Sequence, residues 1–390
     1  MLRFFAPSYI SAGFVSVLVG YAGAGAIIFQ AANAAGASPA EVSSWIWALG
    51  IGMGVSTAGL TLWYRQPVMI AWSTPGAALL VTSLPGLPMS DAIGVFLFSS
   101  LLLTLCGATG LFQKIMDVVP KSLGAALLAA VLLRFGLDAF VALEDNFALA
   151  GGMLLVYLLA RQLTSRFVIP LTFLTGIVIA WTQGGLTGFN PDFSLTTPVF
   201  VMPTVNIPAM IGIGIPLFVV TMASQNVPGI AALRTHGYDA PASPLIGWSG
   251  AIGLVLAPFG GFAFNLAAIT AAICMGKDVH PDPSRCYPAT LWASIFYILT
   301  GLFGAALTSL FVAFPAALIM AIAGLALLST IANSLDTAMT DESEREAAIL
   351  TFAVTASGVT LLSIGSPFWG LLVGMAAHLL KKYSTRMRQE

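Results

Sequence analysis

The chain has 390 residues, of which 58% are hydrophobic and only 8% are charged, and its mean hydropathy is +0.94. Soluble domains carry about 25% charged residues, so this composition excludes a soluble protein and indicates a polytopic protein of the lipid bilayer. The formal net charge of −1 gives no reason to expect nucleic acid as a partner. Three scattered cysteines (Cys106, Cys274 and Cys286) predict neither a disulfide framework nor a metal site, and we expect no cofactor.

Fourteen apolar segments follow one another along the chain. Several are shorter than the roughly 20 residues of a simple helical span. Helix-start chemistry marks some boundaries: Ser38 and Glu41 form a capping box, Ser343 begins another, and Ser90 with Asp91 opens the fourth segment. The segments lie near residues 8–33, 39–63, 67–84, 89–112, 120–138, 145–161, 166–183, 207–230, 243–258, 260–275, 287–309, 314–336, 345–363 and 366–383.

The positions of the basic residues test this count. With a cytoplasmic N-terminus and one crossing per segment, 14 of the 15 lysines and arginines fall on the cytoplasmic side. The exception, Arg134, lies near the outer end of the fifth segment, close to Asp138. This pattern is the positive-inside rule, obeyed loop by loop. We therefore expect a multi-pass membrane protein with both termini in the cytoplasm.

The segments divide evenly into two sets of seven, about residues 1–185 and 205–390, joined by a loop rich in Gly, Pro and Thr. Because seven is odd, the second set must enter the membrane in the opposite orientation. Inverted repeats of this kind recur in secondary transporters. The expected fold class is an all-α polytopic membrane protein with 14 transmembrane segments in a 7+7 inverted repeat, with short extended pieces in segments 3 and 10.

The third segment cannot be one uninterrupted helix. Pro67 and Pro75 each lack a backbone donor and disfavour helical geometry in the preceding residue. Residues 68–72 favour a strand, after which Ser73 or Thr74 can cap a half-helix with Pro75 in its first turn. Free N–H groups and the positive end of a helix dipole would then lie inside the membrane, where something anionic or polar can bind.

The tenth segment repeats this design. Gly260 and Gly261 break it after Pro258, residues 262–264 can be extended, and Asn265 can cap a half-helix that reaches Ile273. The two half-helix starts would face each other near the middle of the membrane. Irregular backbone at that depth must be surrounded by protein or by a water-filled cavity, so we expect a pocket there.

The run TMASQNVPGI in the eighth segment places Gln225 and Asn226 in an apolar helix just before Pro228 and Gly229, which should loosen that helix. Polar side chains at such depth need partners. Two interpretations stay open: hydrogen bonding between helices or to freed backbone, and contact of at least one of the two amides with a substrate.

Other candidates carry the same ambiguity. Ser73, Thr74 and Asn265 can be plain caps or substrate contacts. Phe264 and Trp72 can stack on an aromatic substrate or simply pack. Tyr21, among small residues, can line a pocket or a close helix contact. No span offers a carboxylate pair, a metal motif or a mid-membrane cation, which argues against an enzyme; a carboxylate substrate would be held by helix N-termini and amides.

The chain resembles the benzoate transporter (BenE-type) family over nearly its whole length. The stretches TLWYRQPVMIAWSTPGAALL (Thr61–Leu80), LFVVTMASQNVPGIAA (Leu217–Ala232) and AAITAAIC (Ala267–Cys274) carry the resemblance. It implies proton-coupled uptake of benzoate, a small aromatic carboxylate, with protons as the second partner, across a bacterial inner (plasma) membrane. The family is more distantly similar to uracil-permease and sulfate-permease-type transporters.

That wider likeness implies a core domain of residues 1–113 and 205–312 (segments 1–4 and 8–11) and a gate domain of residues 114–185 and 313–390 (segments 5–7 and 12–14). Alternating access would move the core against the gate, with substrate between the third and tenth segments. The implied substrate-binding residues are Tyr21, Ser73, Thr74, Gly76, Gln225, Asn226, Phe264, Asn265 and Leu266.

One departure from the wider group matters. Its nucleobase members have an acidic residue just before the Asn of the tenth segment, where this chain has Phe264, and the eighth segment offers Gln225 in place of a carboxylate. The substitution argues against nucleobases and leaves proton coupling without an obvious carrier. An uncoupled anion channel or exchanger, or transport of another small organic substrate, stays open as the alternative, and so does a homodimer.

Overall fold

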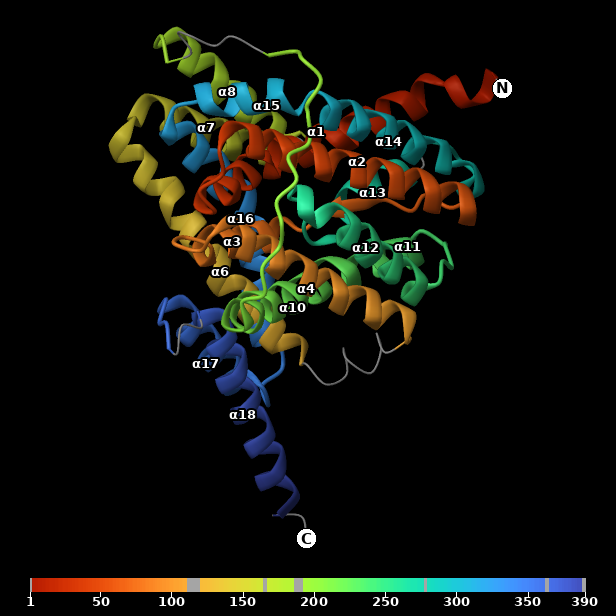
Figure 1. Ribbon diagram of the computed structural model, residues 1–390. Helices are drawn as coiled ribbons and strands as arrows, with labels where there is room; N and C mark the ends of the chain where they lie inside the picture. Colours follow the sequence, from red (N-terminus) through yellow and green to blue (C-terminus); the bar gives the residue numbers. More distant parts are fainter. Residues whose placement is uncertain are drawn as a thin grey trace.

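The computed structural model describes residues 2–110, 120–163, 167–185, 192–276, 279–361 and 365–387 as a largely helical protein (Figure 1). The first half holds the 3₁₀ turn η1 (Leu2–Phe5), α1 (Pro7–Ala34), α2 (Pro39–Tyr64), β1 (Ile70–Trp72), α3 (Thr74–Ser83), α4 (Met89–Ala108), α6 (Lys121–Asp145), α7 (Phe147–Leu163) and α8 (Val168–Thr182). The second half holds α9 (Ile207–Ala209), η2 (Met210–Gly214), α10 (Ile215–Thr221), η3 (Met222–Asn226), α11 (Val227–Thr235), α12 (Ala242–Leu256), η4 (Ala257–Phe259), β2 (Phe264–Leu266), α13 (Ile269–Met275), η5 (Pro283–Arg285), α14 (Tyr287–Leu302), α15 (Gly304–Ala313), α16 (Ala316–Thr340), α17 (Arg345–Ala356) and α18 (Ser366–Met387).

The helices are those of a multi-pass membrane protein. Within the described residues, six are long and apolar enough to cross a bilayer: α2, α4, α6, α16 and the composite helices Ile207–Arg234 and Ala242–Phe259. Two bent pairs raise the number to as many as eight; in one of them α14 meets α15 at 68°. A helix, or a strand followed by a helix, overlaps each predicted apolar segment, while the number of crossings stays a prediction.

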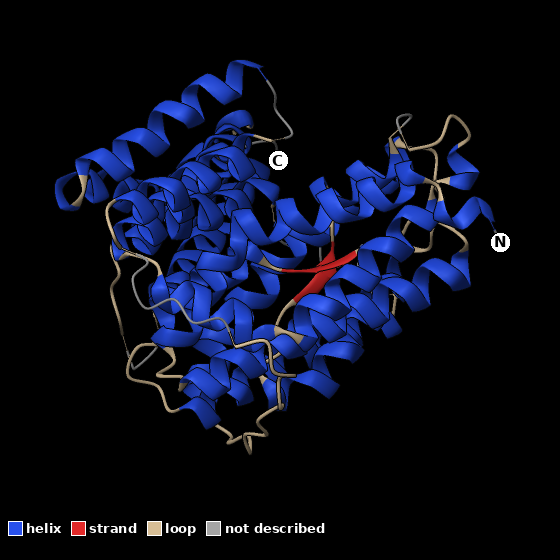
Figure 2. Ribbon diagram, turned by 90° about the horizontal axis from the view of Figure 1, so that it is seen from above, coloured by secondary structure: helices blue, strands red, loops and turns tan. Residues whose placement is uncertain are grey.

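The extended pieces in segments 3 and 10 are confirmed, and they pair with each other. β1 and β2 form a two-stranded antiparallel sheet in which Ile70 faces Leu266, Ala71 faces Asn265 and Trp72 faces Phe264. The strands lie near the middle of the molecule, with helices on all sides (Figure 2). Their pairing satisfies backbone groups that an apolar interior would otherwise leave without partners.

Two details of the tenth segment differ from the prediction. The strand covers Phe264–Leu266 instead of residues 262–264, because Ala263 turns the chain with a positive φ of 44°. Asn265 is therefore not the cap of the half-helix. It pairs with Ala71 in the sheet, and α13 begins four residues later, at Ile269.

The predicted caps had mixed outcomes. Ser38 forms the full capping box of α2, and Ser73 caps α3. The cap predicted at Ser90 and Asp91 is wrong, because Pro88 lets α4 begin at Met89. The cap predicted at Ser343 is also wrong: its N–H and hydroxyl donate to the Asp341 carboxylate in the preceding turn, and α17 begins at Arg345.

The eighth segment is one continuous helix with two wide turns. Pro228 and Gly229 do not interrupt it; the irregularity takes the form of the π-helical turns η2 and η3, and η3 ends just before α11. π-helical turns are rare overall, but those that occur are often found at functional sites. They rotate a few side chains out of the ordinary helical register. Here η3 carries both amides that the sequence singled out.

Close packing around the sheet depends on small residues. A Cβ at Gly50 of α2 would lie 2.6 Å from the Cα of Gly301 in α14, and one at Gly107 of α4 would lie 2.2 Å from the backbone nitrogen of Gly247 in α12. Gly260 has a φ of +92°, and a Cβ there would overlap the ring of Trp45. These approaches hold α14 against α2 and α4 against α12, and α2 and α12 in turn pack on the strands.

Candidate binding site at the strand crossing

Hydroxyl groups of α2 hold the outer edge of β1. The Ile70 N–H donates to Thr57 Oγ1 at 2.9 Å, and Thr61 Oγ1 donates to the Val68 carbonyl at 2.8 Å. Both threonines are fully buried. A strand of three residues pairs on one side only, so its other edge needs side-chain partners inside an apolar bundle. The two hydroxyls therefore fix the position of the extended piece and of the helix that follows it.

Asn226 does the same for β2. Its Oδ1 accepts the Leu266 N–H at 3.0 Å, and its Nδ2 lies 3.4 Å from Met222 Sδ. Gly229, one turn further on, lets α11 approach, since a Cβ there would lie 2.6 Å from the Leu266 Cβ. The interpretation of Asn226 as a link between helix and freed backbone accounts for both of its contacts.

The start of α3 points at this crossing. Ser73 is fully buried; its N–H donates to the Ala263 carbonyl at 3.0 Å and its Oγ accepts the Gly76 N–H at 3.0 Å. Thr74, the first helical residue, is half-buried. A Cβ at Gly76 would lie 2.8 Å from Leu217 Cδ1, so the glycine lets α10 close against α3. The positive end of the α3 dipole is thereby fixed beside β2 in a low-dielectric place.

Asn265 carries an unsatisfied acceptor at the same place. The side chain is fully buried, its Nδ2 donates to the Ala263 carbonyl at 3.0 Å, and its Oδ1 has no partner among the described residues. Leaving such an atom without a donor costs about 1–3 kcal/mol. A buried acceptor without a donor is rare in folded proteins, and a bound polar ligand is one of the partners that can satisfy it.

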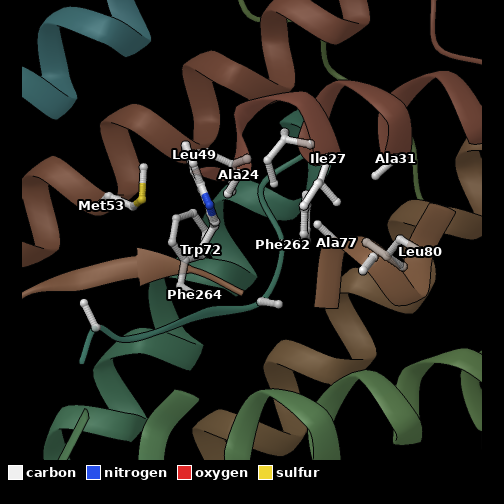
Figure 3. Packing of buried hydrophobic residues seen from close by; sticks show 14 of the residues in the cluster. Ala24, Ile27, Ala31, Leu49, Met53, Trp72, Ala77, Leu80, Phe262 and Phe264 are labelled. Carbon is white, nitrogen blue, oxygen red and sulfur yellow. The ribbon is translucent and has the colours of Figure 1, made fainter. Parts of the chain in front are cut away.

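Aromatic rings cover the other side of the sheet. Tyr21 of α1 packs edge-on against Trp72 with ring centroids 4.7 Å apart, and its hydroxyl accepts from Thr300 Oγ1 at 2.9 Å. Phe264 is fully buried beside Trp72 (Figure 3), and a Cβ at Gly52 would lie 2.5 Å from its ring. A cavity of about 10 Å³ remains here, lined by Tyr21, Gly25, Ile28, Ile46, Leu49, Trp72 and Phe311.

Gln225 lies next to Asn226 on η3 and is half-buried. Its side chain makes no hydrogen bond with any residue that the structure describes. The fold thus brings eight of the nine predicted residues into one junction through direct contacts or adjacency along β1–α3 and β2, and Gln225 borders that junction. Their roles toward a substrate stay predictions.

The electrostatics of the site rest on dipoles. Among the described residues, no Asp, Glu, Lys, Arg or His side chain is buried, and no group of three or more possible metal ligands occurs. Sequence reasoning missed three hydroxyls that support the site: Ser16, which donates to the Thr270 carbonyl at 2.8 Å, Thr61 and Thr300. Isolated hydroxyls in apolar helices mostly bond their own helix, so the sequence holds no signal that separates these three.

Two interrupted spans whose extended pieces pair inside a helical bundle define a membrane transporter of the broken-helix type. The chain belongs to the family described as "Benzoate membrane transport protein" (BenE), whose model matches residues 3–380. It is 50% identical over 374 residues to the "Inner membrane protein YdcO" of Escherichia coli (strain K12), covering 96% of each chain. It is 36% identical over 369 residues to the "Benzoate membrane transport protein" of Acinetobacter baylyi, covering 95% of this chain and 94% of that one.

Solved structures share the fold at low identity. The transmembrane domain of the cyanobacterial bicarbonate transporter BicA matches with a TM-score of 0.60 and 13% identity, covering 96% of this chain and 97% of that one. SLC26A9 matches with a TM-score of 0.59 and 14% identity, covering 94% of this chain, which spans 65% of the length of SLC26A9. The protein is therefore a helical membrane transporter with the fold of these anion-transporter structures.

Proposed function

We propose that this protein is a secondary active transporter that takes up benzoate or a related aromatic carboxylate together with a proton across the inner membrane. Family membership and the printed name of the Acinetobacter relative support the substrate class. The printed name of the Escherichia coli relative supports the inner membrane. The observation that carries the proposal is the buried crossing of β1 and β2, where the α3 N-terminus and the unpaired Asn265 Oδ1 lie beside aromatic rings.

This geometry suits a protonated aromatic acid. The acid's O–H can donate to Asn265 Oδ1, and its carbonyl oxygen can accept from the Thr74 hydroxyl or from an N–H in the first turn of α3. The ring would lie toward Tyr21 and Trp72. Because no described carboxylate is buried, the proposal assigns the transported proton to the substrate itself. Gln225, Asn226, Phe264 and Leu266 then line or brace the site.

We further propose 14 crossings in a 7+7 inverted repeat, both termini in the cytoplasm, and the division into a core (1–113 and 205–312) and a gate (114–185 and 313–390). The pattern of helix contacts supports the repeat. In a 7+7 repeat, α2 is equivalent to α12 and α14 is equivalent to α4. α2 packs on α14, and the equivalent pair, α12 and α4, also packs together. Likewise α7 packs on α8, and their equivalents α17 and α18 pack on each other. Alternating access then moves the strand crossing past α6 and α16.

The test is uptake of labelled benzoate into liposomes containing the purified full chain, with an acidic exterior. Benzoic acid also crosses lipid unaided, so protein-free liposomes under the same gradient are the control. We expect saturable uptake above that control, inhibited by excess benzoate but not by uracil or sulfate. Asn265→Ala should weaken uptake without reducing the yield of inserted protein. If the wild type shows no saturable uptake of benzoate, the proposed function is refuted.

An uncoupled anion exchanger or channel is the second candidate. It is favoured by the fold shared with anion-transporter structures and by the lack of a buried described carboxylate. The two candidates differ in what drives them. An exchanger needs an anion on the far side and carries benzoate without a proton, whereas the proposed transporter accumulates benzoate to an extent set by the imposed pH gradient.

A further inference from the structure

The ring of Phe311 closes the aromatic side of the strand crossing. Phe311 lies near the end of α15, the short helix that the 68° bend turns away from α14. Its side chain is buried and stacks on Phe29 of α1, with centroids 5.6 Å apart and an interplanar angle of 20°. Phe314 packs edge-on against it at 5.7 Å. The ring is therefore held in one orientation against α1.

A glycine on α1 makes room for this ring. A Cβ at Gly25 would lie 2.8 Å from Phe311 Cζ, closer than real contacts allow, so the tip of the ring occupies a notch that only glycine leaves open. Gly25 is four residues from Tyr21, and residues at this spacing lie on the same face of a helix. The Phe311 ring thus lies beside the Tyr21–Trp72 pair and lines the same cavity.

The cavity is too small for a substrate while the ring is in place. Its volume is about 10 Å³, whereas holding one water takes roughly 10–15 Å³ and an engineered cavity that binds benzene measures about 150 Å³. Phe311 carries a phenyl group, the same six-membered ring that benzoate carries. Removing this side chain from the pocket would vacate a space with the size and shape of the substrate's own ring.

We propose that Phe311 is a plug that occupies the ring position of the substrate and must withdraw from the Gly25 notch before an aromatic acid can bind. The identity of the acid rests on the proposed function; the plug itself does not. A route for withdrawal is built into the chain. Only Phe314 and Pro315 separate α15 from α16, so a movement of α16 relative to α1 pulls directly on the plug. Phe311 therefore opposes binding by filling the pocket in the closed state.

The first test is independent of transport. Ile28 lines the cavity and is buried, and the three native cysteines are buried as well. In the detergent-purified full chain, Ile28→Cys should react slowly with a polar maleimide, and adding Phe311→Ala should speed the reaction by about tenfold or more, because the closed state loses its plug. Gly25→Ala should also speed it, since its methyl group displaces the ring.

Phe135→Ala in α6 is the matched control. This phenylalanine has the same 5% exposure as Phe311 but does not line the cavity, so its truncation should leave the Ile28→Cys rate unchanged. Phe311→Leu, which keeps a large apolar side chain, guards against a variant that fails to fold. Equal rates with and without Phe311→Ala in monodisperse protein would overturn the plug, and so would an equal acceleration by Phe135→Ala.

The second test concerns affinity. In liposomes, Phe311→Ala should lower the KM for benzoate uptake by about tenfold, because the acid no longer competes with the phenyl ring for the pocket, and Phe135→Ala should leave the KM unchanged. An unchanged KM in Phe311→Ala would refute the competition between this ring and the substrate. If the wild type shows no saturable benzoate uptake while the maleimide result holds, the proposed function fails and the plug stands.

Discussion

The hydroxyl of Thr57 offers the sharpest test of how the strand crossing is held. Its Oγ1 accepts the Ile70 N–H at 2.9 Å, and both residues are fully buried. Thr57→Val keeps the shape of the side chain and removes the acceptor, which leaves a buried backbone N–H without a partner. We expect a loss of about 1–3 kcal/mol of stability. Thr57→Ser keeps the oxygen and removes one methyl group, which costs about 0.8 kcal/mol.

The assay is the thermal unfolding midpoint of the purified protein in detergent, followed by tryptophan fluorescence. One kcal/mol moves the midpoint by about 2–4 °C in a chain of 150–250 residues and by less in a longer one, so Thr57→Val should lower it by about 2–5 °C. The control is Thr172→Val in α8. Thr172 is equally buried, but its hydroxyl donates only to the Val168 carbonyl of its own helix, so little should be lost.

Two results would refute this reasoning. If Thr172→Val lowered the midpoint as much as Thr57→Val, the effect would follow from losing any buried hydroxyl. If Thr57→Ser were as destabilising as Thr57→Val, the methyl group and its packing would matter, and the bond to Ile70 would not hold the strand. The bond also predicts that Thr57→Val weakens benzoate uptake more than Thr57→Ser does, because β1 positions the start of α3.

Three further predictions concern separate features. Gly260→Ala should sharply reduce the yield of folded protein on purification, since its Cβ would overlap Trp45 and overpacking costs roughly 1–3 kcal/mol. Gly237 has a similar positive φ of 84° but open space around it, so Gly237→Ala should reduce the yield less. Equal yields for the two variants would contradict the overlap with Trp45. Gln225→Ala should raise the KM for benzoate by up to about tenfold with no change in the thermal midpoint, because the side chain bonds no described residue; the reverse pattern would make it structural. The Ser284 hydroxyl and N–H donate to the Asp282 carboxylate and hold its pKa below the usual value. These bonds therefore stabilise the turn fully above the ordinary pKa of about 4. The stabilisation is lost as the pH falls through the lower pKa of the folded state. Protection of the Ser284 amide against hydrogen exchange, measured relative to the intrinsic rate at each pH, should fall in that acidic range. Asp282→Ala should remove this change in protection, and a change that persists would assign it to another group.

Local chemistry predicted much of this architecture. Pro67 and Pro75 exclude a continuous helix, and Ser or Thr before a proline in the first turn is a strong cap, so the extended piece and a cap at Ser73 or Thr74 were readable from the chain. The structure selects Ser73. The same rules failed at Asn265. Its side chain is a good cap in isolation, but the register with Ala71 places it inside the sheet, and that register depends on residues almost two hundred positions away.

The sequence by itself determined that the chain lies in a membrane, where its helices are, and that two spans are interrupted, because composition, proline and capping chemistry act over a few neighbouring residues. Only the tertiary structure decided which polar atoms have partners. Asn226 and Gln225 are neighbours in the chain, yet one bonds the Leu266 N–H and the other bonds no described residue. The Phe311 ring, likewise one aromatic residue among many in sequence, faces Gly25 and the cavity only because the bend after α14 turns it there. Hydrogen bonds and packing join residues distant in sequence, and their geometry exists only once the helices have met.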